Sequence, residues 1–188
     1  MSESELLAAA AELEAHLAAR VAQGEHAQMR GRWTIQCHRK GELLWEDVIE
    51  NLVVNAGLNH ALDATLSAGS QITTWYLGLM SASPTAAAGD TMSSHGGWTE
   101  VTAYDEAARQ TWTDGGVSGQ SVSNSGSPAV FTISTNGTDV GGCFLTSVNT
   151  KGGTTGTLFA AGAFAAGNKS LDDGDTLTVT ATFTNAAA

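Results

Sequence analysis

Two different periodicities run along the chain. Over the first thirty residues, apolar side chains recur at spacings of three and four, which predicts an amphipathic helix over residues 3–22 that ends before Gly24. This stripe buries little area per turn, so the helix needs a partner, which is either the body of this protein or another chain. The apolar positions of the stripe are Leu6, Ala10, Leu13, Leu17 and Val21.

From Arg32 onward the period changes to two, which is typical of β-strands. Residues 33–38 alternate between apolar and polar side chains, the Arg-Lys-Gly sequence at 39–41 indicates a turn, and Glu42–Trp45 returns as a second strand. A short helix follows this hairpin. Asn55 is placed to cap the helix, and Gly69 marks its end. Its apolar positions, all on one side, are Leu58, Leu62 and Leu66.

The remainder of the chain is rich in Gly, Ser and Thr and contains several short apolar runs. The last run, Thr176–Thr184, is the clearest strand, because threonines alternate with apolar residues and predict one solvated face and one dry face. The loop over Ser81–Thr99 is long enough to need a reason to be ordered. Other strands are predicted over Gln71–Met80, Arg109–Thr113, Ala129–Ser134, Val140–Val148 and Thr157–Ala161.

Together these elements predict a mainly β fold. Many short strands separated by glycine turns favour an antiparallel β-sandwich or jelly-roll-like domain, with an N-terminal amphipathic α-helical arm and one short internal helix. We expect the helical arm and its linker over residues 1–31 and the β-rich body over residues 32–188.

Charge narrows the classes of function. Lys and Arg number 8 against 19 Asp and Glu, for a formal net charge of −11, so the chain is short of the cations that bind nucleic acid.

No run of about 18 apolar residues predicts a membrane span. Met1–Glu5 lacks the positive start of a secretory signal, so we expect no export by that route. One group of cations is interpreted as a solvated face, with a docking patch for an acidic neighbour as the alternative: His26, Arg30, Arg32, His38, Arg39 and Lys40.

The loop before Glu100 holds the densest set of reactive side chains. Its serines and His95 lack the strand-turn-helix context of a hydrolase nucleophile. His95 with Asp90 or Glu100 could be drawn as a metal site, but the spacing matches no familiar template. The favoured interpretation is that the polar side chains cap the loop's own backbone while Met92 and Trp98 anchor it to the core.

Three further features have a structural and a functional interpretation. The Asp-Asp-Gly-Asp sequence at 172–175 is interpreted as a tight turn, with an ion site as the alternative. Cys37 and Cys143 are interpreted as buried thiols, while a disulfide or half of a metal site stays open. The five tryptophans favour core packing over stacking on sugars or bases. No phosphate-binding, dinucleotide-binding or metalloprotease motif occurs, so we predict neither an enzyme nor a cofactor.

Several stretches, taken together, resemble a family of small virion proteins of tailed bacteriophages over about residues 32–184. The stretches are WTI at 33–35, NLVVNAGLN at 51–59, WYLGL at 75–79, DTMSSHGGWTE at 90–100 and GDTL at 174–177. The resemblance implies a structural role, first as a capsid decoration (cement) protein on the outer surface of the phage head, made in the host cytoplasm. A neck, head-fibre or tail component of the virion is the alternative, and a glycan-binding β-module is a third hypothesis.

In the decoration role, the partners are the major capsid protein and copies of the chain itself, with a homotrimer as one arrangement. No nucleic acid, membrane, metal or cofactor is expected. The helical arm lies outside the resemblance, and its assignment as a partner-binding segment is physical: an amphipathic helix on a flexible linker reaches a second neighbour. The residues assigned to partner binding are Leu6, Leu13, Leu17, Val21, Arg30 and Arg32, and those assigned to anchoring the long loop are Met92, His95 and Trp98.

Overall fold

The computed structural model describes residues 28–186, and the compact body within them spans Met29–Thr184. The predicted helix over residues 3–22, with its partner-binding positions, lies outside the described residues. The first strand starts at Gln28, four residues before the predicted start of the β-rich body at Arg32.

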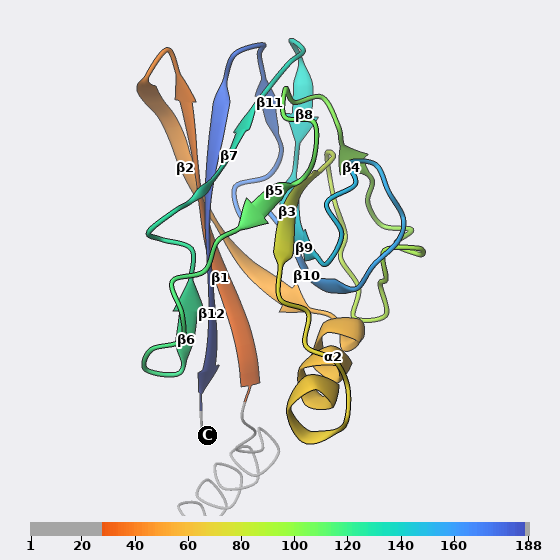
Figure 1. Cartoon of the computed structure of the whole chain (residues 1–188). Helices are drawn as coiled ribbons and strands as arrows, with labels where there is room; N and C mark the ends of the chain where they lie inside the picture. The colour runs from red at the N-terminus through yellow and green to blue at the C-terminus, as the bar shows by residue number, and fades with distance from the viewer. Residues whose placement is uncertain (1–27, 187–188) are drawn as a thin grey trace, which may run out of the picture. The chain divides into compact units, whose positions relative to one another are not determined.

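The described chain is mainly β, as predicted, with one helix (Figure 1). In chain order its elements are β1 Gln28–Arg39, β2 Glu42–Val53, α2 Asn55–Leu66, β3 Trp75–Met80, β4 Glu100–Val101, β5 Gln110–Trp112, β6 Ser121–Ser123, β7 Ala129–Thr132, β8 Thr138–Val140, β9 Gly142–Thr146, β10 Leu158–Ala163, β11 Lys169–Leu171 and β12 Thr176–Ala186.

A large antiparallel sheet folds into a sandwich-like arrangement around β2. On one side the strand order is β6-β12-β1-β2, with β7 also paired to β12, and on the other it is β2-β10-β9-β3-β4, with β5 also paired to β3. The first part of β2 pairs with β1, whereas Leu52 and Val53 at its end pair with β10. One strand therefore belongs to both layers and connects them by backbone hydrogen bonds.

The β1–β2 hairpin has the predicted turn. Lys40 and Gly41 both have positive φ angles, 52° and 88°, as the two central residues of a type I′ hairpin turn do. The register runs from Gly31 opposite Asn51 to Arg39 opposite Glu42, with an irregularity between Cys37 and His38. The returning strand is longer than the predicted Glu42–Trp45, because β2 continues to Val53.

The main core lies between the two layers. The apolar side of β12 is buried from Leu177 to Phe183, which confirms the dry face predicted for this strand, while its threonines up to Thr182 are half-buried. Trp33 and Ile35 of β1 are fully buried in the same cluster as Leu77 and Leu79 of β3. Burial of these side chains is the main free energy that holds the two layers together.

A second apolar cluster lies on the other face of β3, β9 and β10. It contains Met80, Phe144 and Leu158 together with Met92 and Trp98 from the long loop over residues 81–99. Every residue of β9 is buried as a result, because this layer is covered on both faces. The long loop is therefore a cover over the outer face of the sheet.

The internal helix exists, but its start differs from the prediction. Val54 occupies the N-cap position, Asn55 is the first helical residue, and no side chain caps the helix. The predicted capping by Asn55 is therefore wrong. The backbone N–H of Asn55 instead donates to the carbonyl oxygen of Ala88 at 2.8 Å, so the long loop supplies the acceptor at this end.

Candidate functional site

The polar side chains of the long loop hold the loop itself in place. The indole N–H of Trp98 donates to Asp90 Oδ2 at 3.0 Å, and the same oxygen accepts the backbone N–H of Ala87 at 3.0 Å. His95 stacks on Trp98 with ring centroids 3.8 Å apart. Because a carbonyl oxygen only accepts, His95 Nδ1–H must be the donor in its 3.0 Å hydrogen bond to Trp98 O. The contacts among Asp90, His95 and Trp98 thus hold the loop in place over the second apolar cluster.

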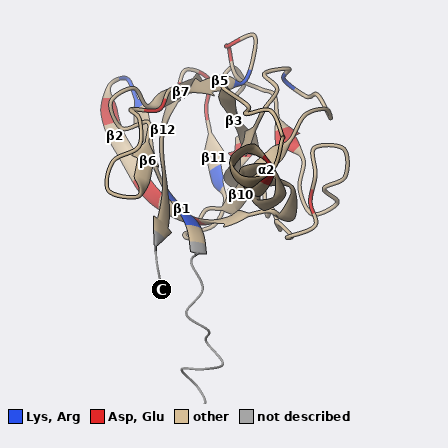
Figure 2. Ribbon diagram, turned by 60° about the horizontal axis from the view of Figure 1, so that its bottom comes forward, with Lys and Arg blue, Asp and Glu red and all other residues tan. Residues whose placement is uncertain are grey.

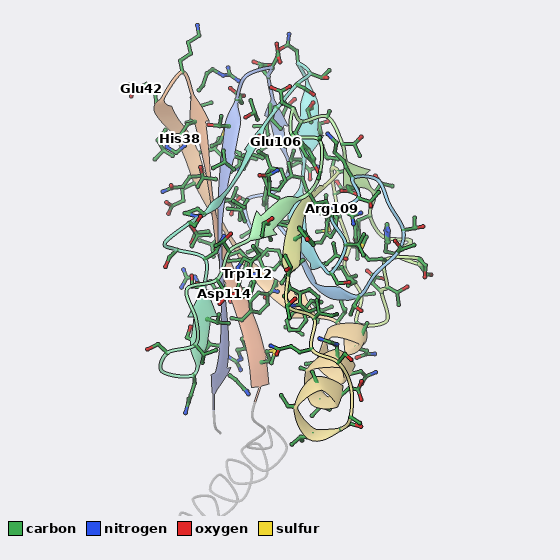
Figure 3. The ribbon with its side chains drawn as sticks, viewed as in Figure 1. His38, Glu42, Glu106, Arg109, Trp112 and Asp114 are labelled. Atoms are coloured by element: carbon green, nitrogen blue, oxygen red, sulfur yellow. The ribbon has the colours of Figure 1, made fainter. Side chains whose placement is uncertain are left out.

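Glu100, the third residue considered as a metal ligand, is paired with the buried Arg109, which Figure 3 labels. Arg109 donates to both carboxylate oxygens of Glu100, at 2.9 Å and 2.7 Å, and also to the carbonyl oxygens of Val148 and Gly153. The Arg109 side chain is fully buried. A bidentate pair that also binds two carbonyls satisfies the guanidinium and fixes the loop over residues 147–153.

Within residues 28–186, no three His, Cys, Asp or Glu side chains gather into a group that could hold a metal ion. Asp90 bonds Trp98, His95 bonds the backbone of the same tryptophan, and Glu100 bonds Arg109. Each of these three side chains has a partner that stabilises the fold.

The Asp-Asp-Gly-Asp sequence forms the predicted turn before β12. Gly174 has a φ angle of 83°, and the N–H of Asp175 donates to Asp172 O at 3.0 Å. Arg39 donates to both carboxylate oxygens of Asp175, at 2.6 Å and 2.7 Å, and lies 2.9 Å from Asp172. The hydrogen bonds from Arg39 are the main cause that lowers the pKa of Asp175. One cation of the predicted basic group therefore pairs with the acidic turn.

Both cysteines are free and fully buried, on different layers of the core. Burial raises the pKa of the Cys37 thiol to about 11, and the nearby Asp175 carboxylate adds to this effect. Burial alone raises the pKa of Cys143. Both side chains are therefore protonated near neutral pH and act as small apolar groups in the core.

Of the residues assigned to partner binding, Arg30 and Arg32 are in the described chain, on β1. Arg32 Nε lies 3.6 Å from Glu50 Oε1 on the neighbouring strand, and both side chains are largely exposed. This surface pair contributes little to the free energy of unfolding. Arg32 stands on the solvent-facing side of the sheet.

Reasoning from the sequence missed one surface. An apolar stripe on a helix usually faces the core, but the apolar stripe of α2 faces the solvent. Leu58, Leu62 and Leu66 lie on one side, but they are 39%, 59% and 83% exposed. The buried residue of the helix is Gly57, which sits against the backbone of Phe159 in β10. We call the three exposed leucines the leucine face.

A small apolar cavity lies at the same end of the body, between the layers. Its volume is about 190 Å³. The indole of Trp75 lies beside it, and contacts both His60 of α2 and Phe159, with ring centroids 5.5 Å and 5.0 Å apart. The lining residues are Met29, Trp75, Trp112, Val122, Leu145, Phe159 and Phe183, and Figure 3 labels Trp112. They come from seven strands, so the spacing within any one strand gives no signal for this cavity.

Comparisons with known proteins leave the family open: no protein-family model, no curated protein and no solved structure matches the chain. Within residues 28–186, no helix is long and apolar enough to cross a membrane.

Proposed function

We propose that this chain is a non-enzymatic structural protein of a bacteriophage virion, which decorates the outer capsid and stabilises it by binding several capsid subunits at once. The resemblance of its loop and strand sequences to small phage virion proteins supports this class. The contacts described above support a protein that acts by binding, since the polar groups of the long loop and the acidic turn are engaged in holding the body together.

The structural observation that carries a binding role is the leucine face, whether its partner is a capsid protein or a second copy of this chain. Three large apolar side chains that stay exposed next to one another on one side of a helix form a contiguous patch, which is typical of a surface that contacts another macromolecule. In Figure 1, α2 lies at the end of the body where β1 starts and β12 ends. The first strand, β1, which follows the predicted amphipathic stripe in sequence, therefore starts at the end of the body that bears the leucine face.

A decoration protein of this kind works through contact area. Packaged DNA puts outward pressure on the capsid lattice, and a protein that bridges several subunits opposes their separation. A body that binds one subunit and an N-terminal segment that binds the next gain avidity, because the second contact forms at high effective concentration. The formal net charge of −11 fits a position outside the shell, away from the packaged DNA.

The first test is the copy number in particles purified from the virus that encodes the chain, measured by quantitative mass spectrometry against the major capsid protein. A ratio of one copy per one or three capsid subunits supports decoration of the whole lattice. A count fixed by a single vertex assigns the protein to the neck or tail instead. A chain that does not occur in the particles refutes a virion role.

The second test concerns the N-terminal segment. Deletion of residues 1–24 leaves every described residue in place, so we expect a folded β-body that binds particles more weakly than the full chain. Binding is measured by co-sedimentation with particles that lack the protein, and folding by circular dichroism. Equal binding by the truncated and full chains would show that the segment makes no capsid contact.

A further inference from the structure

The leucine face is held outward by the packing of α2. A Cβ atom on Gly57 would overlap the carbonyl oxygen of Phe159, so the helix backbone lies directly against β10. Turning the helix to bury its leucines would bring a larger side chain to this contact, where there is no room for one. The exposure of Leu58, Leu62 and Leu66 is therefore built into the fold.

The spacing of these leucines makes the face complementary to itself. The three side chains are identical and separated by one helical turn each, so the stripe is symmetric about Leu62. If two such helices lie antiparallel across a two-fold axis, Leu62 meets Leu62 and Leu58 meets Leu66. Self-complementarity of this kind is what a two-fold interface between identical subunits requires.

The sparse charge of α2 permits the approach of a second copy at this end of the body. Two copies with a formal net charge of −11 repel each other, so they can approach closely only where charges are sparse. Asp63 is the one acidic residue of α2, which contains no Lys or Arg, and Figure 2 shows the helix almost entirely in the colour of other residues. The leucine face is thus an uncharged contact on an acidic protein.

We propose that the leucine face pairs two copies of this chain, with α2 of one copy antiparallel to α2 of the other. The exposed parts of the three leucines together amount to nearly two whole side chains. The area that they can bury is far below the roughly 800 Å² that each partner buries in a standard interface. The pair is therefore weak in dilute solution. It forms where copies are concentrated, and its use on a capsid surface rests on the function proposed above.

Sedimentation equilibrium of the purified full chain tests the pairing. Between about 10 µM and about 1 mM, the mean mass of the wild-type chain rises from the monomer toward the dimer. Leu62→Asp places two carboxylates at the symmetry axis and weakens dimerisation at least about ten-fold. The matched control is Leu44→Asp on β2, because Leu44 is 47% exposed, the substitution adds the same charge, and the residue lies near the β1–β2 turn at the other end of the body (Figure 1).

Cysteine cross-linking tests the antiparallel arrangement. The two native thiols are fully buried, so an added surface cysteine is the one that reacts. Leu62→Cys lies next to its symmetry mate and gives a disulfide-linked dimer under mild oxidation. Leu66→Cys replaces the most exposed of the three leucines, yet it faces position 58 of the partner and cross-links more slowly. Circular dichroism verifies that every variant is folded.

Two results overturn the proposal. One is a wild-type chain that stays monomeric at the highest concentration, in which case protection of Leu62→Cys from alkylation on particles would assign the face to a capsid protein. The other is equal dimerisation by Leu62→Asp and Leu44→Asp, which would move self-association to another part of the chain. Neither result affects the copy-number test, so failure of the pairing is distinguishable from failure of the virion role.

Discussion

The contribution of the long loop to the free energy of unfolding can be measured at Trp98. This side chain is 4% exposed, stacks on His95, packs on Phe144 at a centroid distance of 5.0 Å, and donates to Asp90. Trp98→Ala removes nearly all of that packing and leaves a void beneath the loop. Replacement of a buried tryptophan by alanine costs about 3–5 kcal/mol, and we expect about 4 kcal/mol here.

The change is large enough to measure in two ways. For a chain of this size, each 1 kcal/mol lowers Tm by about 2–4 °C, so Trp98→Ala lowers Tm by about 8–16 °C in scanning calorimetry. Urea unfolding followed by far-UV circular dichroism gives the free energy directly. Hydrogen exchange locates the effect, since the Thr85 N–H, which donates to Gly97 O at 2.9 Å, loses protection when the loop loosens.

Trp98→Phe is the matched control. It keeps an aromatic ring in the cluster and removes the indole N–H, while Asp90 retains its hydrogen bond from Ala87. Its cost is about 1–2 kcal/mol, the range for one hydrogen bond lost in a buried setting with some loss of packing. A loss below about 1 kcal/mol for Trp98→Ala, or equal losses for both variants, would refute the view that this ring holds the loop by packing.

Three other perturbations follow from the described contacts. Gly57→Ala raises intrinsic helix propensity, yet we expect a loss of about 1–3 kcal/mol in urea unfolding, because the new methyl group overlaps Phe159 O; a gain would show that α2 shifts freely. The pKa of Asp175 is lowered in the folded state, so its carboxylate stabilises the fold at pH values above the unfolded-state pKa of about 3.9. This stabilisation is lost as the pH falls through the folded-state pKa. We therefore expect the urea midpoint of Asp175→Asn to decline less in acid than that of the wild-type chain. Cys37, with a pKa of about 11, and the equally buried Cys143 react with a thiol reagent at pH near 8 only after unfolding, and rapid labelling of the native chain would contradict their burial.

The local sequence pattern was sufficient to predict an element where burial depends on the positions of neighbouring residues in the chain. The alternation in Thr176–Thr184 predicted both the strand and its dry face, and the turn residues at 39–41 predicted the hairpin. Both inferences depend on side chains that alternate across a single strand or on a turn that glycine permits. These are properties that neighbouring residues carry by themselves, so the mainly antiparallel β fold could be predicted.

Local pattern failed where a distant backbone decides the outcome. The leucines of α2 have the spacing of a buried stripe, but contact between Gly57 and Phe159, a hundred residues away in sequence, points them outward. Arg109 is another case, because a charged side chain is expected at the surface and is buried here by a carboxylate and two carbonyl oxygens. Such partners are assembled by the fold and cannot be read from spacing.

The places where the chain enters and leaves the body also determine how it bears load. β1 and β12 are neighbours in the sheet, and Figure 1 shows the start of one beside the end of the other. Force that pulls these two ends apart would peel the strands from each other one hydrogen bond at a time, at low tension. Force applied between the start of β1 and the start of β12, which lie at opposite ends of the body, would instead slide the two strands along each other and load many hydrogen bonds at once. The body is thus mechanically strong along β1 and weak across its two ends.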